Sequence, residues 1–557
     1  MKKKSIHFFT YMLITLIGTS CNDLLDKYPP GSISDGSFWT GESDAELAFF
    51  GAYRWQSGWT HEDFTTPQGL LYLDFAGGHG VEKENFTTLG MASSNTVATS
   101  GNVSGYWNNS YSQIAHYNTF LDNIENCPMD ETKKALWIAE IKCLRAYYFF
   151  YLAFHFKDVP MPLKTLTLSE ANTISQTPQA EVYAHIEKDL LEAIPLLKDK
   201  HEAKDYGRIT KSAAHVLLSR LYIAQVKWVE AATNLKLIID SKLFELDRRN
   251  GDDSYEKLFQ IGGEYSPEMI LCVMAIRDRF TFSHYQYKYP EAYYGGWHQF
   301  APYNELVKEY FCSDGKDIYT SSVYDDDDPY SNRDIRLYAS FFLPPLGSFP
   351  GTSYNNIIYD CYKGSNTSDS YNRYPLFNGY SPKKGCDPTI TNNLGSTYVY
   401  TPLMRYAEVL LTYLEAVNES APTTITQELL DLTINDIRDR VKLPPIPLAD
   451  VSSQASLRAA VRKERRVELA FEGFRYFDVL RWGTAMQELN HIFTGVKLSD
   501  DPSARNYRGS GATASPVDEN MYYQFEVRTW SPHNRYFPIP QGDLNINKNL
   551  KQNDGYN

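Results

Sequence analysis

The sequence lacks the short motifs that mark common classes of hydrolase and nucleotide-binding enzyme. Its 557 residues contain no G-x-S-x-G turn, no HExxH motif and no Walker A loop. Cysteine is scarce as well: there are seven, with no C-x-x-C pair and no Cys/His spacing typical of a metal site. These absences argue against a serine hydrolase, a zinc protease, a P-loop enzyme and a zinc-binding module, and we expect no cofactor and no metal.

Positively charged residues and long apolar runs are also scarce. The 54 Lys and Arg residues are outnumbered by 68 Asp and Glu, which gives a formal net charge of −14. Such a chain is a poor partner for nucleic acid or for an anionic polysaccharide. Beyond the first 20 residues, no apolar run is long enough to cross a bilayer as a helix. With 43% apolar residues, however, the chain can build a large core.

The N-terminus has the pattern of a bacterial export signal that ends at a lipidation site. Lys2–Lys4 are positive, Ile6–Ile17 is mostly apolar, and small residues follow up to Cys21. We expect residues 1–20 to be removed and acyl chains on Cys21 to anchor the mature protein. Gly18 stands where such sites usually have an aliphatic residue, so the alternative is an ordinary cleaved signal followed by a chance cysteine.

Leucine and alanine recur at spacings of three and four in several segments, which predicts a mostly α-helical scaffold. The segments are 131–156, 179–198, 211–226 and 228–241. Residues 211–226 and 228–241 have the length and the small residues of a tetratricopeptide-like helix pair. Such pairs cannot bury their apolar faces alone, so we expect them to stack into a curved scaffold.

Two segments, about 60–106 and 280–400, lack this periodicity and are rich in Gly, Pro, Asn, Asp and aromatic residues. Of the 121 residues from 280 to 400, 28 are aromatic, well above the 14% of the whole chain. We predict loops and short strands laid over the scaffold, with a ligand surface where the two segments meet. The alternative is that the tyrosines only pack on the scaffold, which we expect for most of them.

Residues 462–483 separate into two faces at helical period. The apolar face holds Val467, Ala470, Phe471, Phe474 and Phe477, and the charged face holds Arg465, Glu468, Glu472 and Arg475, with signs that pair. Gly473 costs about 1 kcal/mol relative to Ala and suggests close approach of another backbone. Glu464, Glu468 and Glu472 could suggest a hydrolase, but the arginines around them favour ionised carboxylates, whereas a general acid must keep its proton. We predict a packed helix with an ion-pair stripe.

This stretch resembles the C-terminal signature of the SusD/RagB family of nutrient-binding outer-membrane lipoproteins of Bacteroidetes. Further segments resemble the family in the same order: Asn22–Pro30, Leu144–Phe149 with Asp158–Pro160, Gly207–Ala214, Asn332–Arg336, Met404–Leu411, Asn435–Arg440, and Phe537–Pro540 with Gln552–Tyr556. The resemblance implies one SusD-like domain over 21–557, with four tetratricopeptide-like helix pairs split along the sequence. Residues 403–419 and 426–441 would then supply another pair, and residues 454–482 a long helix near the C-terminus. The helical scaffold of this domain would cover about 22–60, 107–275 and 401–557.

The resemblance also implies a function. Family members bind oligosaccharides, or peptides in some branches, and lie as a lid on a SusC-like TonB-dependent transporter, which they supply without catalysis. We therefore expect a lipid-anchored glycan-binding protein on the outer surface of the outer membrane, partnered by such a transporter, and not an enzyme. The alternatives are a RagB-like lid that binds peptides or glycopeptides, and a scaffold that only holds the transporter.

The best candidate for the ligand platform is the stretch Tyr293–Gln299, because two glycines adjoin a tryptophan and two tyrosines. Aromatic faces stack on the apolar faces of sugar rings, and carboxylates and amides suit sugar hydroxyls. We expect an uncluttered, flexible backbone there, with an opposing wall from the early loop. The predicted ligand residues are Trp297, Tyr293, Tyr294, Tyr72, Asp74 and Asn85. For Trp297, the alternative is that it only caps the scaffold beneath it.

For three further features of the sequence we expect a structural role and no role in ligand binding. Trp107 and Trp482 lie on helix-like sequence and are expected in the core. The run Asp325–Asp328 could bind calcium through its oxygens, but it lacks the spacing of an EF-hand, so we expect a solvated loop. A disulfide is permitted outside the cytoplasm, and Cys361 with Cys386 is the first pair to consider.

Overall fold

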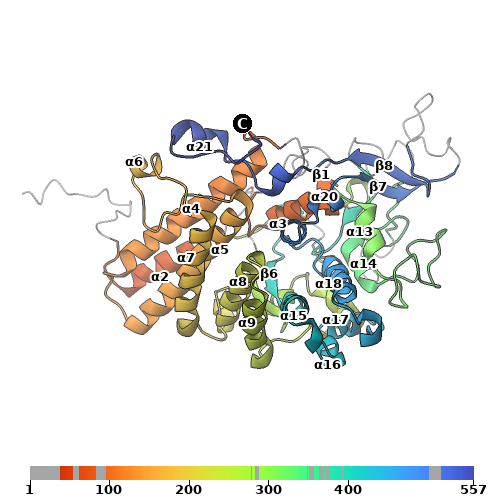
Figure 1. Cartoon of the computed structure of the whole chain (residues 1–557), viewed down its shortest axis with the longest axis horizontal. Helices are drawn as coiled ribbons and strands as arrows, with labels where there is room; N and C mark the ends of the chain where they lie inside the picture. The colour runs from red at the N-terminus through yellow and green to blue at the C-terminus, as the bar shows by residue number, and fades with distance from the viewer. Residues whose placement is uncertain are drawn as a thin grey trace, which may run out of the picture.

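Helices from the first and last parts of the chain form the scaffold of the computed structural model, and the loop-rich middle segment with α13 (Asn304–Glu309) and α14 (Ile335–Ser340) lies at one side, beside α18 (Gln454–Glu468) (Figure 1). The structure describes residues 38–53, 62–82, 96–277, 279–282, 288–347, 349, 357–362, 369, 371, 377–390, 394–500 and 516–556. The scaffold helices are α2 (Glu42–Ala52), α4 (Gly101–Ile124), α5 (Glu131–Phe156), α7 (Gln179–Ala193), α8 (Lys211–Ala224), α9 (Trp228–Ser241), α15 (Tyr406–Ser420), α16 (Gln427–Leu432), α17 (Ile434–Arg440) and α18 (Gln454–Glu468). The prediction of a mostly α-helical fold is confirmed.

Helix α5 lies at the centre of the first group of helices. Asp130 caps its N-terminus by accepting a hydrogen bond from the Lys133 N–H at 2.8 Å. Every residue from Cys143 to Phe156 is buried, as is usual for a helix with apolar side chains on all faces. Helices α4 and α7 pack against α5, α8 packs against α9, and α15 packs against both α9 and α18 (Figure 1). The scaffold therefore joins helices from distant parts of the sequence.

Shorter helices complete the fold, several of them in or beside the loop-rich layer. They are α3 (Pro67–Asp74), α6 (Leu168–Ala171), α10 (Ser254–Lys257), α12 (Glu291–Tyr294), α13 (Asn304–Glu309), α14 (Ile335–Ser340), α19 (Arg475–Arg481), α20 (Ala485–Glu488) and α21 (Gln541–Ile546). The described strands pair as antiparallel couples: β1 (Gly80–Glu82) with β3 (Phe300–Pro302), β2 (Met269–Val273) with β6 (Thr401–Arg405), β4 (Phe341–Phe342) with β5 (Ser381–Pro382), and β7 (Ile492–Lys497) with β8 (Tyr522–Val527). Each of the first three couples joins segments far apart in the chain.

The predicted helix boundaries hold best where the sequence is most periodic. Helices α5 and α9 have the predicted bounds, and α7 and α8 end a few residues early. The segment 403–419 begins as strand β6 and becomes helix α15 only at Tyr406, and the segment 426–441 is two helices.

The predicted continuous helix 454–482 is wrong, because the chain turns sharply between α18 and α19. Phe471 and Gly473 have φ angles of +66° and +89°, which no α-helix allows. A Cβ at Gly473 would lie 2.7 Å from Leu70 Cδ2 and 3.2 Å from Leu70 Cα. The close approach of another backbone at this glycine is therefore confirmed, and it is the early segment 67–74 that approaches.

The predicted ion-pair stripe is also wrong in its pairing, although its residues are buried. Arg465 pairs with Asp478 at 2.7 Å, and Arg475 pairs with Glu488. Glu468 instead contacts three arginines from other segments: Arg405 at 2.6 Å, Arg440 at 2.6 Å and Arg336 at 2.9 Å. We call Glu468 and these three arginines the central charge cluster.

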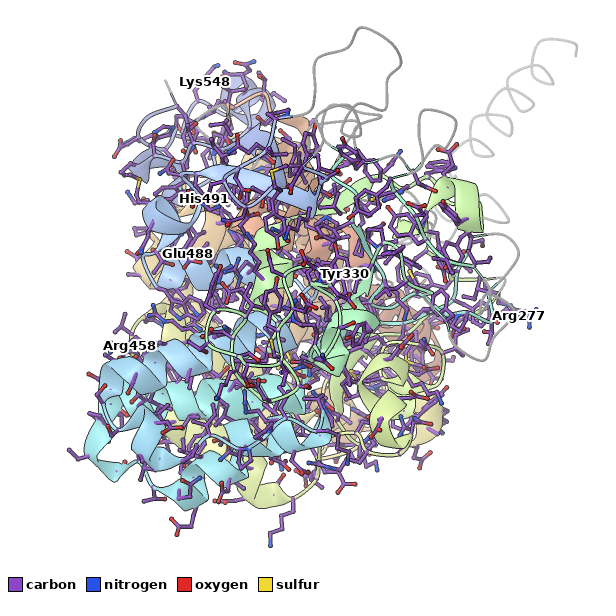
Figure 2. All side chains as sticks on the ribbon, turned by 90° about the vertical axis from the view of Figure 1, so that its right-hand side faces the viewer. Arg277, Tyr330, Arg458, Glu488, His491 and Lys548 are labelled. Atoms are coloured by element: carbon purple, nitrogen blue, oxygen red, sulfur yellow. The ribbon has the colours of Figure 1, made fainter. Side chains whose placement is uncertain are left out.

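Most buried aromatic side chains of the loop-rich layer belong to the same hydrophobic core as the scaffold helices, and a small separate cluster forms around Tyr303. Tyr303 stacks on Phe493 with ring centroids 4.0 Å apart, and the Tyr330 and Tyr380 hydroxyls lie 2.9 Å apart. Figure 2 shows Tyr330 among the side chains of this layer and Arg277 at its outer edge, with Arg458 of α18 on the helical side. Most described aromatic residues of this layer are buried, as expected, whereas Trp297 and Tyr319 are 40% and 80% exposed.

The remaining structural expectations have mixed outcomes. The six cysteines after Cys21 are buried free thiols, so the Cys361–Cys386 disulfide is wrong. Trp107 is buried as expected, and Trp482 is half-buried at the end of α19. The Asp325–Asp328 run is an exposed loop, and no described group of three His, Cys, Asp or Glu side chains could hold a metal ion. Within the described ranges, no helix combines the length and apolarity of a membrane span.

Candidate ligand-binding face

The two loop-rich segments meet in the sheet formed by β1 and β3. Glu82 pairs with Phe300, and Gly80 pairs with Pro302. One residue further on, the Tyr303 N–H donates to the His79 carbonyl at 3.0 Å. Residues 62–82 and 288–303 are thus joined through their backbones, which makes the edge of this sheet a defined place for side chains from both segments.

Trp297 lies on a tight turn between α12 and β3. Gly295 ends α12 with a φ of +74°, and its N–H donates to the Glu291 carbonyl at 3.0 Å. A Cβ at Gly296 would lie 2.0 Å from the Tyr289 carbonyl oxygen, so only glycine fits there. The expected uncluttered backbone is therefore wrong at Gly296, which packs directly against Tyr289, whereas nothing lies within 4 Å of a Cβ at Gly295.

The residue after Trp297 fixes the other side of the turn. The His298 N–H donates to the Tyr289 carbonyl at 3.1 Å. Its imidazole is fully buried, with Nδ1 2.6 Å from the buried Asp369 Oδ1. Because Gly296 and His298 are both buried while Trp297 is 40% exposed, the turn presents the indole outward from a rigid base.

The two tyrosines of the predicted platform differ in exposure. Tyr293 is half-buried, donates from its hydroxyl to the Asp360 carbonyl at 2.9 Å, and packs edge-on against Tyr359. Tyr294 is buried, and its ring lies 5.2 Å from that of Phe342. Tyr293, four residues before Trp297, is therefore a second partly accessible aromatic residue, whereas Tyr294 belongs to the buried core.

The described residues of the predicted opposing wall, Tyr72 and Asp74, do not lie at the surface. Tyr72 is buried: its hydroxyl accepts a hydrogen bond from Gln68 Nε2 at 2.6 Å, and its ring packs edge-on against Phe300. Asp74 is fully buried and accepts from the Arg475 N–H at 2.7 Å. These side chains lie behind the sheet because α3 packs against α19 and its neighbours, so neither offers a surface to a ligand. Asn85 and Cys21 lie outside the described residues.

Glu468 of the central charge cluster and Glu472, which shares Arg405 with it, do not form an active site. Burial alone would raise the pKa of Glu468, but the guanidiniums of Arg440, Arg405 and Arg336 outweigh it and hold that pKa well below its usual value. Burial would likewise raise the pKa of Glu472, and Arg405 with Lys384 lowers it. The cavity beside Glu472 measures only about 40 Å³. A carboxylate held ionised with no room for a substrate cannot act as a general acid, so the cluster is structural.

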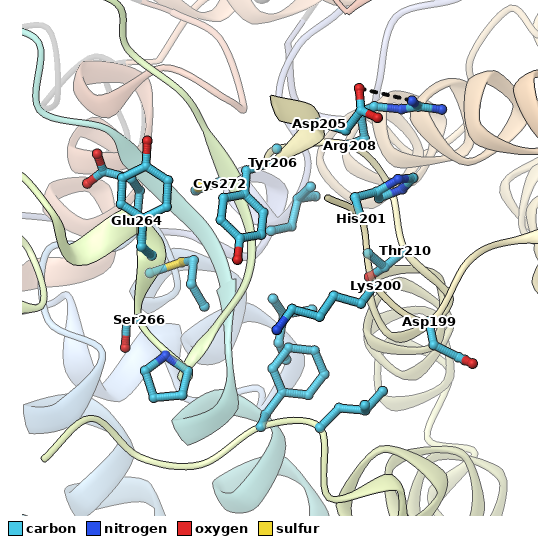
Figure 3. A pocket seen from close by; sticks show the side chains of 18 residues that line it. Asp199, Lys200, His201, Asp205, Tyr206, Arg208, Thr210, Glu264, Ser266 and Cys272 are labelled. Carbon is cyan, nitrogen blue, oxygen red and sulfur yellow. Dashed lines mark ion pairs between the residues drawn. The ribbon is translucent and has the colours of Figure 1, made fainter. Parts of the chain in front are cut away.

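Sequence reasoning missed a pocket on the scaffold side, between the α7–α8 connection and β2 (Figure 3). Tyr206 and Tyr265 line it, with ring centroids 5.4 Å apart. The nearest sequence signal is Gly207, which follows Tyr206 and approaches β2 closely, since its Cβ would lie 3.2 Å from the Cys272 carbonyl oxygen. That contact joins residues distant in sequence, so periodicity could not reveal it.

Comparison with known proteins agrees with this architecture. The model described as the SusD family matches residues 274–556, and the model described as starch-binding associating with outer membrane matches residues 77–223. The crystal structure of a SusD-like carbohydrate binding protein from Bacteroides fragilis has a TM-score of 0.81 and 31% identity, covering 92% of this chain and 100% of that chain. SusD-like protein P2 of Formosa agariphila is 28% identical with all of both chains covered, and a SusD-like protein of Bacteroides ovatus is 22% identical over 95% of this chain and 91% of its own. The sequence, the helical scaffold and the inserted loop-rich layer of this chain support one assignment. The chain belongs to the SusD family, also called SusD/RagB.

Proposed function

We propose that the chain is a cell-surface lipoprotein that captures oligosaccharides and delivers them to a SusC-like TonB-dependent transporter without catalysing their cleavage. The proposal takes the general role from the family, in which a relative at 31% identity is described as carbohydrate binding. It takes the place of binding from the described side chains around the β1–β3 sheet.

The observation that carries the proposal is the exposed indole of Trp297 on its rigid turn. A ring that is 40% exposed, between neighbours that are buried, loses little conformational freedom when a ligand stacks on it. Tyr293 lies four residues earlier with part of its ring accessible. Sugar rings offer apolar C–H faces to such a platform, while their hydroxyls need polar partners. We place these partners on the early segment, and Asn85 remains the candidate there.

Anchoring and delivery complete the proposal. The apolar stretch that ends at Cys21 supports lipidation at that cysteine, and the outer-membrane association described for the matching family supports the location. Cys21→Ala should move the protein from the membrane fraction to the soluble fraction and should abolish incorporation of labelled palmitate. Gentle detergent extraction of the wild type should bring down a transporter of the TonB-dependent class; recovery of the chain alone would count against delivery.

Native affinity gels that contain one soluble polysaccharide each test the ligand class. Retardation by one neutral glycan, lost in Trp297→Ala and kept in Tyr319→Ala, is the expected result. Tyr319 is a suitable control because it is an exposed aromatic residue of the same layer outside the turn. Binding of peptides and of no glycan would support the peptide-binding alternative, and binding of neither would support the transporter scaffold alone. Both of these outcomes would contradict the proposal.

A further inference from the structure

The pocket shown in Figure 3 differs from the predicted platform in place and in chemistry. Three segments line it: the connection from α7 to α8, the turn after α9, and the stretch from Glu264 into β2. Its volume of about 210 Å³ is below the roughly 300–1,000 Å³ of pockets for drug-sized ligands. A single ring with its substituents fits this space better than a chain of several sugars.

The α7–α8 side of this pocket is fixed before any ligand arrives. Arg208 forms a two-pronged ion pair with the buried Glu140 of α5, with Nη2 2.7 Å and Nε 3.1 Å from the carboxylate oxygens. His201 Nε2 donates to the Ile209 carbonyl at 2.8 Å, which ties the middle of the connection to its end before α8. Gly207 packs directly against β2. A pre-formed wall of this kind reduces the entropy cost of binding.

One face of the pocket is aromatic. Tyr206 is half-buried and Tyr265 is 52% exposed, and their rings meet at 45°. Phe244 and Met269 add apolar surface to the lining. With Tyr265 behind it, the Tyr206 ring is a supported surface on which a flat, partly apolar ring could stack.

Most of the charged side chains that line the pocket have charged partners, and one cation, Lys200, and one carboxylate, Glu264, have no ion pair in the described part of the chain. Asp199 pairs with Lys211 at 2.9 Å, Asp205 pairs with Arg208 at 3.2 Å, and Glu264 accepts from the Gly262 N–H at 2.7 Å. Lys200 forms no ion pair or hydrogen bond within the described part of the chain. Figure 3 shows its side chain extended across the pocket, with the Tyr206 hydroxyl turned toward the same space and the Glu264 carboxylate turned away.

We propose that this pocket is a second binding site, which takes one sugar ring bearing a single anionic group, a carboxylate or a sulfate. Lys200 pairs with the anionic group, the Tyr206 hydroxyl donates to it or to a ring oxygen, and the Tyr206 ring stacks on the sugar. The net charge of −14 disfavours binding of a polyanionic glycan. We therefore expect the ligand to carry one acidic sugar on an otherwise neutral oligosaccharide. This inference rests on the proposed glycan-binding function and extends its specificity.

Three small probes test the proposal on the full-length protein in detergent: methyl glucoside, its 6-sulfate and methyl glucuronide. Titration followed by NMR should give dissociation constants at least fivefold lower for one or both anionic probes than for methyl glucoside, since a hydrogen bond between charged groups is stronger than a neutral one. Comparison of the dissociation constants of methyl glucuronide and the 6-sulfate then identifies the preferred anionic group. Equal binding of the neutral and anionic probes, or no binding of any probe, would overturn the proposal.

The variant Lys200→Met keeps most of the aliphatic stem and removes the charge. It should bind the anionic probes no better than methyl glucoside while its melting curve stays unchanged, and Lys200→Arg should recover part of the difference. Lys188→Met, an exposed lysine of α7 outside the pocket, is the matched control and should behave as wild type. Unchanged anionic binding in Lys200→Met would overturn the assignment.

The same experiment separates this inference from the proposed function. Binding of neutral oligosaccharides that depends on Trp297, without any preference for the anionic probes, would overturn the second site and leave the proposed function intact. Binding of anionic probes that depends on Lys200, without binding of any longer glycan at Trp297, would contradict the platform and support the pocket.

Discussion

The helical scaffold and the loop-rich layer are both well packed, but they are specified differently. In the scaffold, each helix carries its own apolar stripe, and the buried run Cys143–Phe156 of α5 follows directly from local sequence. In the layer, the contacts are long-range, as between Tyr303 and Phe493 or between Tyr330 and Tyr380. The comparison teaches that aromatic richness alone does not mark a ligand surface. In the proposed function, the mark of a ligand surface is instead the rare exposed ring, here Trp297 on its tight turn.

Loss of one acid from the central charge cluster should give the largest effect, because it disrupts the junction of scaffold and layer. Glu468→Gln removes the carboxylate that Arg336, Arg405 and Arg440 share. Glu464, Glu472 and Glu268 remain as partners, so the three buried guanidiniums have one negative charge fewer. We expect a loss of about 3–5 kcal/mol in the free energy of unfolding, measured by denaturant titration. Glu419→Gln, which breaks a more exposed pair with Arg458, should cost about 0–1 kcal/mol. Equal losses would show that the cluster has no special role.

The contact between Gly473 and Leu70 should give the next largest effect. Gly473→Ala adds a Cβ at a φ of +89° and 2.7 Å from Leu70 Cδ2, so strain and overpacking act together. We expect a loss of about 2–4 kcal/mol in stability. Gly483→Ala has a φ of +69° but no atom within 4 Å of the new Cβ, and it should cost only about 1 kcal/mol. The difference between the two variants measures the packing contribution, and a difference near zero would contradict the close contact.

The buried Asp74 should make stability fall as the pH rises. Burial raises its pKa to about 7 in the folded protein, from an ordinary value near 3.8. The folded state therefore holds a proton that the unfolded state has lost, and the stabilisation present below about pH 4 disappears as the pH rises through 7. Asp74→Asn, which stays neutral, should lose less thermal stability than wild type between pH 5 and pH 8. Parallel pH curves for the two proteins would refute the raised pKa.

The sequence predicted the scaffold well because its signals are local. Helices α5 and α9 have the predicted bounds, and the early and middle loop segments do meet, in the β1–β3 sheet. The end of α18 could not be predicted, because Phe471 fits the apolar stripe of a helix and only the approach of Leu70 requires the turn. The partners of Glu468 come from three distant segments, which periodicity cannot pair.

The candidate site was predicted in part for the same reason. The Gly-Gly-Trp stretch is a local signal, and Trp297 is exposed as the platform requires. Tyr72 and Asp74 are of the right residue types for a ligand wall, yet the packing of α3 buries them. The pocket at Tyr206 was missed because Tyr206, Tyr265 and Lys200 come together only through the contact of the α7–α8 connection with β2.

Trp297→Ala is the variant expected to disturb the fold least, and it tests the proposed function most directly. Trp297→Ala removes an exposed ring, so the melting temperature should stay within about 1–2 °C of wild type. Calorimetric titration with an oligosaccharide of the glycan that retards wild type in affinity gels should show at least fivefold weaker binding, consistent with the roughly 1–3 kcal/mol known for aromatic stacking on nucleobases. Tyr319→Ala should bind like wild type. Unchanged affinity of Trp297→Ala, or a collapse of its fold in place of a loss of binding, would contradict the platform.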